Sequence, residues 1–454
     1  MVQSSKQVVP RAEAAPSSTK KSFSSLHRKA LLSGVLVVLA LVFLQINGPA
    51  RITLSMASSA INSGDLESAA WWLEGTKFFS PSHASADFLR ARVARKQGNL
   101  ALMGTHLKAS LRKGFDAKLL EREQLLAQIS VGQLSPEIEQ KLSSWIFEPD
   151  ADLADILDAY ANGLTITSRF EDASAILTLW EDKLPADPTP NYRRGRIEEH
   201  LSHFALASAQ YRKALEKNQD NIKAKYSLAR LLNLERQPEE ALAFYKACDV
   251  GVSAPAAKIG MAQCLKALGE SEKARDLLKQ VVDLDPQTVE QSFAAVDEKP
   301  ERLMSASELG CIETELGNYS DAKLYLEMAL ARYPRDSIAR YSYAVALRGL
   351  GMSKESEENF ERTRQARAAL DQITVLKEKL RANSQDTGVR IKIGQIVLEN
   401  ESENAGIYWI ESVFAYDPTN EEAHKVLVDY FESQVDDGGK NQQVLEYHRS
   451  FLKK

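Results

Sequence analysis

The sequence predicts an all-α protein, a solenoid of stacked helical hairpins preceded by one N-terminal transmembrane helix. Gly64, Gly98 and Gly132 recur at equal intervals, and a leucine follows each of them two positions later. A fixed period of about 34 residues is typical of repeated helical hairpins. Before the repeats, residues 30–50 contain no Asp, Glu, Lys or Arg. Such a run is just long enough to span a membrane as a helix.

A second series of markers keeps the same period where the glycine is absent. Ala173, Ala207 and Ala241 follow one another at the interval of the glycines, and Ala274 comes one position early. Ala322 lies one period and an insertion of 14 residues beyond Ala274. A leucine or tyrosine follows each alanine by four positions and shares its helical face. The series predicts the second helix of each unit.

Each unit is expected to form a first helix, a tight turn and a second helix. The glycine supplies the positive φ that a helix C-cap often requires, and the small alanine lets the two helices pack closely. Pro334, twelve positions after Ala322, ends its unit because proline lacks an amide hydrogen and clashes with the preceding turn. A single hairpin leaves an apolar face uncovered, so neighbouring units are expected to stack.

This frame divides the chain into seven parts. Residues 1–29 are expected to be a disordered, basic, cytoplasmic tail, and residues 30–50 a transmembrane signal anchor. The remaining parts are about seven repeats over 51–288, an insert at 289–302, further repeats over 303–370, a helical linker at 371–386 and degenerate C-terminal repeats over 387–454.

The repeats resemble the tetratricopeptide repeat family, whose pattern places glycine and then an aromatic residue or leucine at the turn, followed by alanine and proline. The fullest copy is GNYSDAKLYLEMALARYP, residues 317–334. The resemblance covers nearly everything after Ala50, and it implies a right-handed α-solenoid that binds other proteins. The residues that define the repeat are Gly64, Gly98, Gly132, Ala173, Ala207, Ala241, Ala274, Gly317, Ala322 and Pro334.

The composition agrees with a helical array. Of the 454 residues, 44% are hydrophobic and 26% are charged, and only 22 are glycine and 15 proline. The formal net charge is −5 at pH 7, from 57 basic and 62 acidic side chains. This balance predicts no nucleic-acid partner.

The N-terminal segment predicts where the repeats work. Six basic residues precede the uncharged run and only one acid, Glu13, accompanies them: Lys6, Arg11, Lys20, Lys21, Arg28 and Lys29. By the positive-inside rule, the tail stays in the cytoplasm and the repeats cross the membrane. We therefore expect a single-pass protein of a bacterial plasma membrane, with its repeats exported.

Two other interpretations of this segment stay open. Gly48 and Ala50 offer a small-x-small cleavage site, so the uncharged run can be a secretory signal that is removed. The Ser-rich basic tail also has the composition of a mitochondrial presequence. An anchor and a cleaved signal both export the repeats.

No catalytic motif is present in the sequence, which lacks a Walker loop, a nucleophile elbow and an HExxH motif. We therefore expect no enzyme activity, no catalytic residue, no cofactor and no small-molecule substrate. The alternative from a different class is a metal-dependent enzyme that uses His200 and His203, which follow Glu198 and Glu199. That site would need a third ligand supplied by folding, so no metal is predicted.

The three cysteines leave two interpretations open. In an oxidising compartment Cys248 and Cys264 can form a disulfide, because the helices that carry them are expected to pack together. Alternatively these two residues and Cys311 fill buried positions where repeats of this kind use alanine.

The concave face is the predicted binding site. In the family that the chain resembles, the first helix of every unit lines the inner surface. This geometry places ten residues there: Arg92, Arg95, Tyr192, Arg196, Lys223, Tyr226, Arg230, Asn233, Tyr341 and Arg348. Tyrosine and arginine four positions apart recur in neighbouring units, as Tyr192 with Arg196 and Tyr226 with Arg230. Such pairs suit an extended acidic peptide or a C-terminal carboxylate. The alternative is that they are ordinary solvated helix residues.

These expectations describe a membrane-anchored scaffold that mediates protein–protein interaction at the cell envelope. Its partner would be a protein or an extended peptide, with acidic peptides favoured by the arginines of the concave face. The alternative within the same class is an accessory factor for envelope, secretion or cytochrome assembly, where similar anchored solenoids occur.

Overall fold

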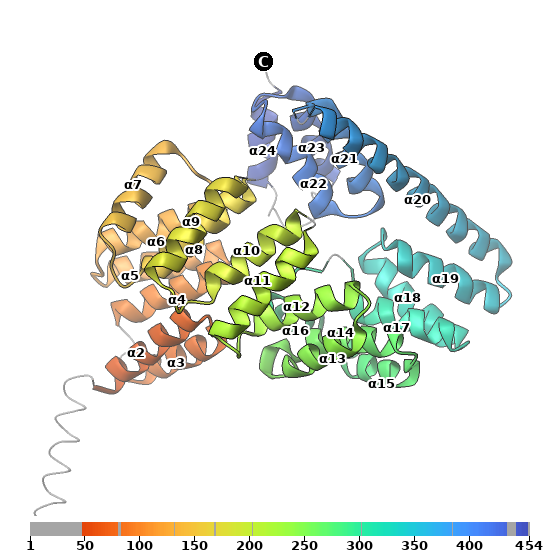
Figure 1. Ribbon diagram of the computed structural model, residues 1–454, viewed down its shortest axis with the longest axis horizontal. Coiled ribbons are helices and arrows are strands. Elements are labelled where there is room, and N and C mark those ends of the chain that lie inside the picture. The colour runs from red at the N-terminus through yellow and green to blue at the C-terminus, as the bar shows by residue number, and fades with distance from the viewer. Residues whose placement is uncertain are drawn as a thin grey trace, which may run out of the picture. The chain divides into compact units, whose positions relative to one another are not determined.

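The computed structural model describes residues 48–79, 83–130, 132–167, 169–201, 203–300, 302–383, 385–433 and 442–452. Over these residues the chain forms twenty-three α-helices, α2 to α24, two short 3-10 helices, η1 and η2, and no strand (Figure 1). The prediction of an all-α chain is confirmed for this part of the protein.

The predicted membrane segment lies almost wholly outside the described residues, as do the basic tail and the residues before a cleavage site. Only Gly48 to Ala50 are described, and they begin helix α2 (Gly48–Ser63). Within the described ranges, no helix is both long enough and apolar enough to cross a bilayer.

The chain divides into two compact units, residues 1–123 and 124–454. In the first unit, α2 pairs with α3 (Leu66–Phe79) and α4 (Ala84–Lys96) pairs with α5 (Leu100–Arg112). Helix α6 (Ala117–Ser130) begins in this unit and ends in the second.

The second unit begins with fourteen elements that mostly follow one another as pairs. They are α7 (Pro136–Phe147), α8 (Leu153–Ile166), α9 (Phe170–Lys183), α10 (Thr189–His200), α11 (Phe204–Lys217), α12 (Ile222–Leu234), α13 (Pro238–Ala247), η1 (Gly251–Ser253), α14 (Ala254–Ala267), α15 (Ser271–Val282), α16 (Pro286–Ala295), α17 (Met304–Glu315), α18 (Tyr319–Arg332) and α19 (Ser337–Gly349). From α10 to α19 each hairpin packs within itself and on the next one, so one apolar core runs through several repeats.

One long helix occupies the region where a separate linker was expected. Helix α20 (Ser353–Ala382) is continuous for 30 residues, because no glycine or proline interrupts it. Its second half packs on α21 (Thr387–Asn400) through Leu376 and Leu380. The chain then forms α22 (Glu403–Glu411), η2 (Ser412–Ala415), α23 (Glu421–Ser433) and α24 (Gln442–Ser450).

The turn at Gly317 explains why glycine marks the repeat. Its φ of 80° lies in the left-handed region. Its amide donates to the carbonyl of Thr314 at 3.1 Å, and the Asn318 amide donates to the carbonyl of Glu313 at 2.8 Å. These two hydrogen bonds are those of a Schellman cap, and they reverse the chain between α17 and α18.

Close helix packing explains the small residues of the repeat. Ala322 and Leu326 on α18 are fully buried, and they face α17. A Cβ atom at Gly310 of α17 would lie 2.4 Å from the Leu326 Cγ atom. The two helices therefore approach to a distance that leaves no room for a larger side chain at Gly310.

Candidate functional site

The insert between α15 and α17 contains α16, and the cap at the end of this helix positions the carboxylates of Asp297 and Glu298. At the end of α16, the Glu298 amide donates to the carbonyl of Phe293 at 2.9 Å and the Asp297 amide to that of Ala294 at 3.1 Å. These bonds form a Schellman cap in which Asp297, with φ of 61°, occupies the left-handed position. This conformation is uncommon for a residue with a Cβ atom, although Asp tolerates it better than most. The cap presents Asp297 and Glu298 to α10 and α12.

Asp297 binds α10. Its Oδ2 atom accepts a hydrogen bond from the Tyr192 hydroxyl at 2.9 Å and lies 3.6 Å from Nη1 of Arg193. Burial would raise the pKa of the Asp297 carboxyl, but the charges of Arg193, Lys223 and Arg196 outweigh burial and hold the pKa below its usual value. Asp297 is therefore a stable carboxylate at neutral pH.

Glu298 bridges two consecutive repeats. Its Oε1 atom lies 2.8 Å from Nη1 of Arg196 on α10 and 3.3 Å from Nε of Arg230 on α12. Arg230 also binds Glu199, whose other oxygen accepts a hydrogen bond from the Tyr211 hydroxyl at 2.7 Å. The predicted arginine pair is thus brought together, and carboxylates of the same chain bind both members. We call Tyr192, Arg196, Arg230 and the insert residues Asp297 and Glu298 the insert cluster.

The two predicted groove tyrosines are buried, which corrects the expectation of exposed rings. Tyr192 is 3% exposed and Tyr226 is 4% exposed. Their rings pack on tyrosines of the second helices, with centroids 5.7 Å apart for Tyr192 and Tyr211 and 5.1 Å apart for Tyr226 and Tyr245. Burial raises the pKa of the Tyr192 hydroxyl, and the Asp297 charge raises it further. Tyr192 therefore acts here as a protonated donor rather than as a flat stacking surface.

Arg92 and Arg95 also lie in a different environment from the one expected. Both are buried on α4, where Nε of Arg95 lies 2.5 Å from Oε1 of Glu123 and Nε of Arg92 lies 3.5 Å from Oε2 of the same carboxylate. The Arg92 guanidinium also lies over the ring of Phe88. These contacts are internal to the first unit, so the two arginines form part of its core rather than an open surface.

In the ninth predicted repeat, the two predicted groove residues are exposed rather than buried. On α19, Tyr341 is 55% exposed and the Arg348 side chain is 63% exposed. The Arg348 guanidinium lies 4.4 Å from the centroid of the Phe360 ring, and the Tyr341 ring packs edge-on against that ring. On α12, Lys223 and Asn233 are half-buried. The ten predicted residues therefore differ in exposure, and four of them, Arg92, Arg95, Tyr192 and Tyr226, are buried.

The two histidines of the metal alternative bind different partners. Nδ1 of His203 lies 2.9 Å from Glu198, whereas Nε2 of His200 lies 3.3 Å from the Tyr408 hydroxyl on α22. Among the described residues, no group of three His, Cys, Asp or Glu side chains is arranged to hold a metal ion.

The cysteines are free thiols in this structure. Cys248, Cys264 and Cys311 are all buried, and burial raises the pKa of the Cys248 and Cys264 thiols to about 12. They fill space between helices, and the Cys248–Cys264 disulfide is not formed here.

The residues missed at the sequence level are Asp297 and Glu298. The signal was present, because the 14-residue insertion contains two consecutive acids while α10 carries Arg193, Arg194 and Arg196. The spacing of residues could not show that the insert folds back on α10 and α12. Its partners Tyr192 and Arg196 lie about a hundred residues earlier in the chain.

Several solved structures are similar to parts of this chain. YrrB, described as a tetratricopeptide repeat protein with an unusual peptide-binding site, is 19% identical over 48% of this chain and 96% of its own, with a TM-score of 0.26. PilF of Pseudomonas aeruginosa is 17% identical over 55% of this chain and 97% of its own, with a TM-score of 0.29. Human IFIT1 is 16% identical over 87% and 88% of the two chains, with a TM-score of 0.36. These TM-scores are too low to support an argument about function.

The comparison with family models identifies repeats in the second unit. Models of the tetratricopeptide repeat match residues 192–249, 256–288 and 308–371, which include α10, α12 and α19. No curated protein matches the sequence. With their hairpin pairs and glycine turns, these matched residues are tetratricopeptide repeats.

Proposed function

We propose that this chain is a membrane-anchored scaffold that holds a protein partner on the concave face of its repeats, at the surface of a cell envelope. Tetratricopeptide repeat proteins generally act as protein-interaction scaffolds. The partner segment that fits α10 and α12 best is acidic, because Arg196 and Arg230 stand side by side there and both bind the same carboxylate.

The single observation that carries this proposal is the insert cluster. Asp297 and Glu298 are two consecutive acids that bind one hydroxyl and two guanidinium groups of neighbouring repeats. The chain thus contains its own example of the ligand chemistry that this face accepts. An acidic partner segment would have to displace Asp297 and Glu298. The insert therefore competes with the partner for the same side chains.

A peptide-binding experiment tests the groove. The probe is a fluorescent synthetic peptide of residues 290–300, EQSFAAVDEKP, added to the purified full chain. Replacing Asp297 and Glu298 by alanine should free Arg196 from Glu298, leave Arg230 with Glu199 alone, and tighten peptide binding about tenfold or more relative to the unchanged chain.

Two controls make the result specific. A peptide with Asn and Gln in place of the two acids should bind the opened chain weakly. Adding Arg196→Gln and Arg230→Gln to the opened chain should abolish binding of the acidic peptide. Equal binding of both peptides, or binding that survives loss of both arginines, would show that this face does not recognise carboxylates.

The membrane anchor is supported by the sequence of residues 1–50. Six basic residues precede an uncharged run, which favours a cytoplasmic N-terminus and exported repeats. In right-side-out vesicles, external protease should digest the chain beyond Arg51 and leave the N-terminal tail intact. Protection of the repeats in intact vesicles, with digestion after detergent is added, would contradict this topology.

A further inference from the structure

The first helical hairpin carries an exposed aromatic surface that the insert cluster does not explain. On α3, Phe78 is 93% exposed, Trp71 is 67% exposed and Phe79 is 50% exposed. On α2, Ile52 and Met56 are also exposed, one helical turn apart. Soluble monomeric surfaces rarely gather large apolar side chains in this way, and such a patch marks a contact with a protein or a membrane.

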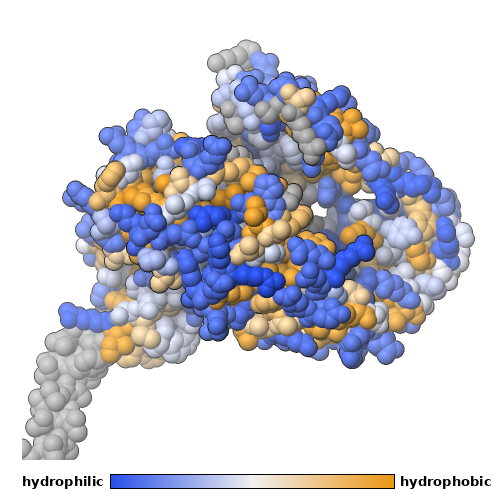
Figure 2. Space-filling model, in the orientation of Figure 1, coloured by the Kyte–Doolittle hydropathy of each residue, from blue (hydrophilic) through white to orange (hydrophobic). Residues whose placement is uncertain are grey.

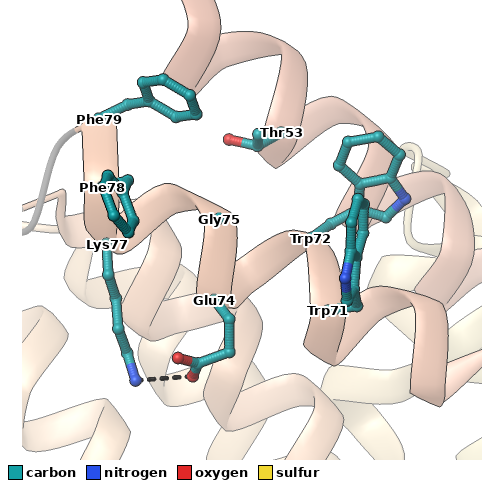
Figure 3. A pocket seen from close by; sticks show the side chains of 8 residues that line it. All are labelled: Thr53, Trp71, Trp72, Glu74, Gly75, Lys77, Phe78 and Phe79. Atoms are coloured by element: carbon teal, nitrogen blue, oxygen red, sulfur yellow. Dashed lines mark ion pairs between the residues drawn. The ribbon is translucent and has the colours of Figure 1, made fainter.

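The aromatic side chains enclose a hollow rather than a flat patch. Trp71 and Trp72 form one wall, with ring centroids 4.6 Å apart, and Phe78 and Phe79 form the other (Figure 3). Gly75 lies between the walls and has no side chain to fill the gap. We call these residues the aromatic slot. Its lining is mostly apolar, which suits a hydrocarbon chain or an apolar side chain.

Charge is nearly absent from the aromatic slot. Of the residues that line it, only Glu74 and Lys77 are charged, and they form an ion pair of 2.6 Å with each other. The pair neutralises itself, so the slot offers no net charge to an acidic or basic protein segment. Lys77 lies beside Phe78, and a lysine next to exposed aromatic rings is the combination found where a protein meets lipid headgroups.

The position of the slot in the chain identifies its occupant. Helix α2 begins at Gly48, directly after a sequence run, residues 30–47, that contains no charged residue. If that run crosses the bilayer, the hairpin α2–α3 emerges at the membrane surface. Figure 2 shows hydrophobic surface over α2, where the described chain begins. Ile52 and Met56 of α2 are exposed on this hairpin, and Thr53 of the same helix lines the aromatic slot.

We propose that the aromatic slot is a membrane-interface site that inserts Trp71, Phe78 and Phe79 among lipid headgroups and takes up lipid acyl chain. This inference rests on the proposed anchoring of the chain. It adds that the first repeat contacts the membrane surface, while the later repeats bind the protein partner. Tryptophan and phenylalanine suit this role, since the first combines an apolar ring with a polar donor and the second supplies apolar area.

Depth-dependent quenching in reconstituted vesicles tests the proposal. The full chain carries Phe78→Cys, labelled with a fluorophore and incorporated into phosphatidylcholine–phosphatidylglycerol vesicles that contain nitroxide-labelled lipid. The matched control is Leu111→Cys on α5, a residue of the same unit that is 56% exposed. Both positions are exposed, and the three native cysteines are buried, so the introduced cysteine is labelled selectively.

The expected result is that lipid nitroxide quenches the label at position 78 about threefold more than the label at position 111, while aqueous iodide shows the reverse order. Equal quenching at the two positions would overturn the proposal. Shielding of position 78 from both quenchers would also overturn it, because the slot would then be covered by protein, either residues of this chain or a second copy.

A parallel extraction separates this inference from the anchor. Alkaline carbonate removes peripheral proteins but not spanning ones from membranes. If the chain resists extraction and position 78 is not quenched by lipid, the anchor stands and the aromatic slot is not an interface site. If the chain is extracted but position 78 is quenched by lipid before extraction, the anchor fails and the slot is a membrane contact in its own right.

Discussion

Two parts of the same predicted groove have opposite environments. In the repeats of α10 and α12, Arg196 and Arg230 are partly buried and bind Glu298 of the insert. In the repeat of α19, Tyr341 occupies the position of Tyr192 and Tyr226, and Arg348 lies one helical turn beyond the position of the two arginines. Both side chains are exposed and contact Phe360 of the adjoining helix. The carboxylates of Asp297 and Glu298, in the cap after α16, bind the first region.

This comparison shows that repeat geometry sets which face a residue lies on, but not whether that face is open. The positions within a unit follow from local helical periodicity. Coverage by another segment depends on contacts between residues far apart in sequence, such as Tyr192 with Asp297. An insert of 14 residues is enough to turn an open surface into an internal charge network.

The largest effect is expected from reversing an arginine of the insert cluster. Arg230→Glu would place a third carboxylate beside Glu199 and Glu298, and it should lower the free energy of unfolding by about 2–4 kcal/mol, somewhat less than for a fully buried pair. Arg348→Glu should change the free energy of unfolding little, since the Arg348 side chain is exposed. Denaturant unfolding of both variants measures this. Equal losses would mean that the two regions have the same environment.

The left-handed residue of the insert cap should respond differently from its counterpart in a repeat turn. Asp297 and Arg236 are the two described residues other than glycine with positive φ, at 61° and 62°. Arg236→Gly relieves backbone strain and should leave stability unchanged or raise it by up to about 1 kcal/mol. Asp297→Gly relieves the same strain but loses the contacts to Tyr192 and Arg193, so stability should fall by about 1 kcal/mol.

If both glycine variants gain stability to the same extent, the Asp297 contacts contribute nothing and the cap alone determines the conformation of the insert. Thermal unfolding of the two variants beside the unchanged chain distinguishes these outcomes.

Removing one hydroxyl should give a loss of similar size. Tyr192→Phe keeps the buried ring but removes the donor to Asp297, at a cost of about 1 kcal/mol, because the carboxylate is left without that hydrogen bond. Tyr341→Phe on the exposed face should have no measurable effect. Calorimetric melting of the pair provides the check, and a loss only in Tyr341→Phe would reverse the assignment of the two regions.

Acid should weaken the insert contact in a defined direction. The pKa of Asp297 is lowered in the folded chain, so its contribution to stability is present in full above its ordinary value of 3.8 and is lost as the pH falls through the lowered pKa. The difference in stability between the unchanged chain and Asp297→Asn should therefore be constant above about pH 5 and shrink toward pH 3. A difference that does not change over this range would show that the Asp297 charge is not stabilised.

Much of the fold could be predicted because it depends on local signals. Gly317 marks a turn because its backbone is left-handed there, and Ala322 marks a helix interface because it is fully buried against the neighbouring helix. The continuity of α20 was missed, although the lack of glycine and proline between Ser353 and Ala382 indicates it.

The site could be predicted only in part. Periodicity placed Arg196 and Arg230 near each other in neighbouring units, as the structure has them. It could not show that Tyr192 packs into the core, because a tyrosine on this face is buried or exposed according to the neighbouring helix. Nor could it show that Glu298 lies between the two arginines, which depends on the path of the insert.

A double-mutant cycle between Arg196 and Glu298 tests the central claim most directly, namely that the insert binds the arginines of the concave face. Their side-chain atoms lie 2.8 Å apart, and Glu298 is on a different helix–loop segment from Arg196. With Arg196→Met, Glu298→Gln and the double variant, we predict a coupling energy of about 1–2 kcal/mol in the free energy of unfolding. Additivity within about 0.3 kcal/mol would contradict the claim, because residues that do not interact show no coupling.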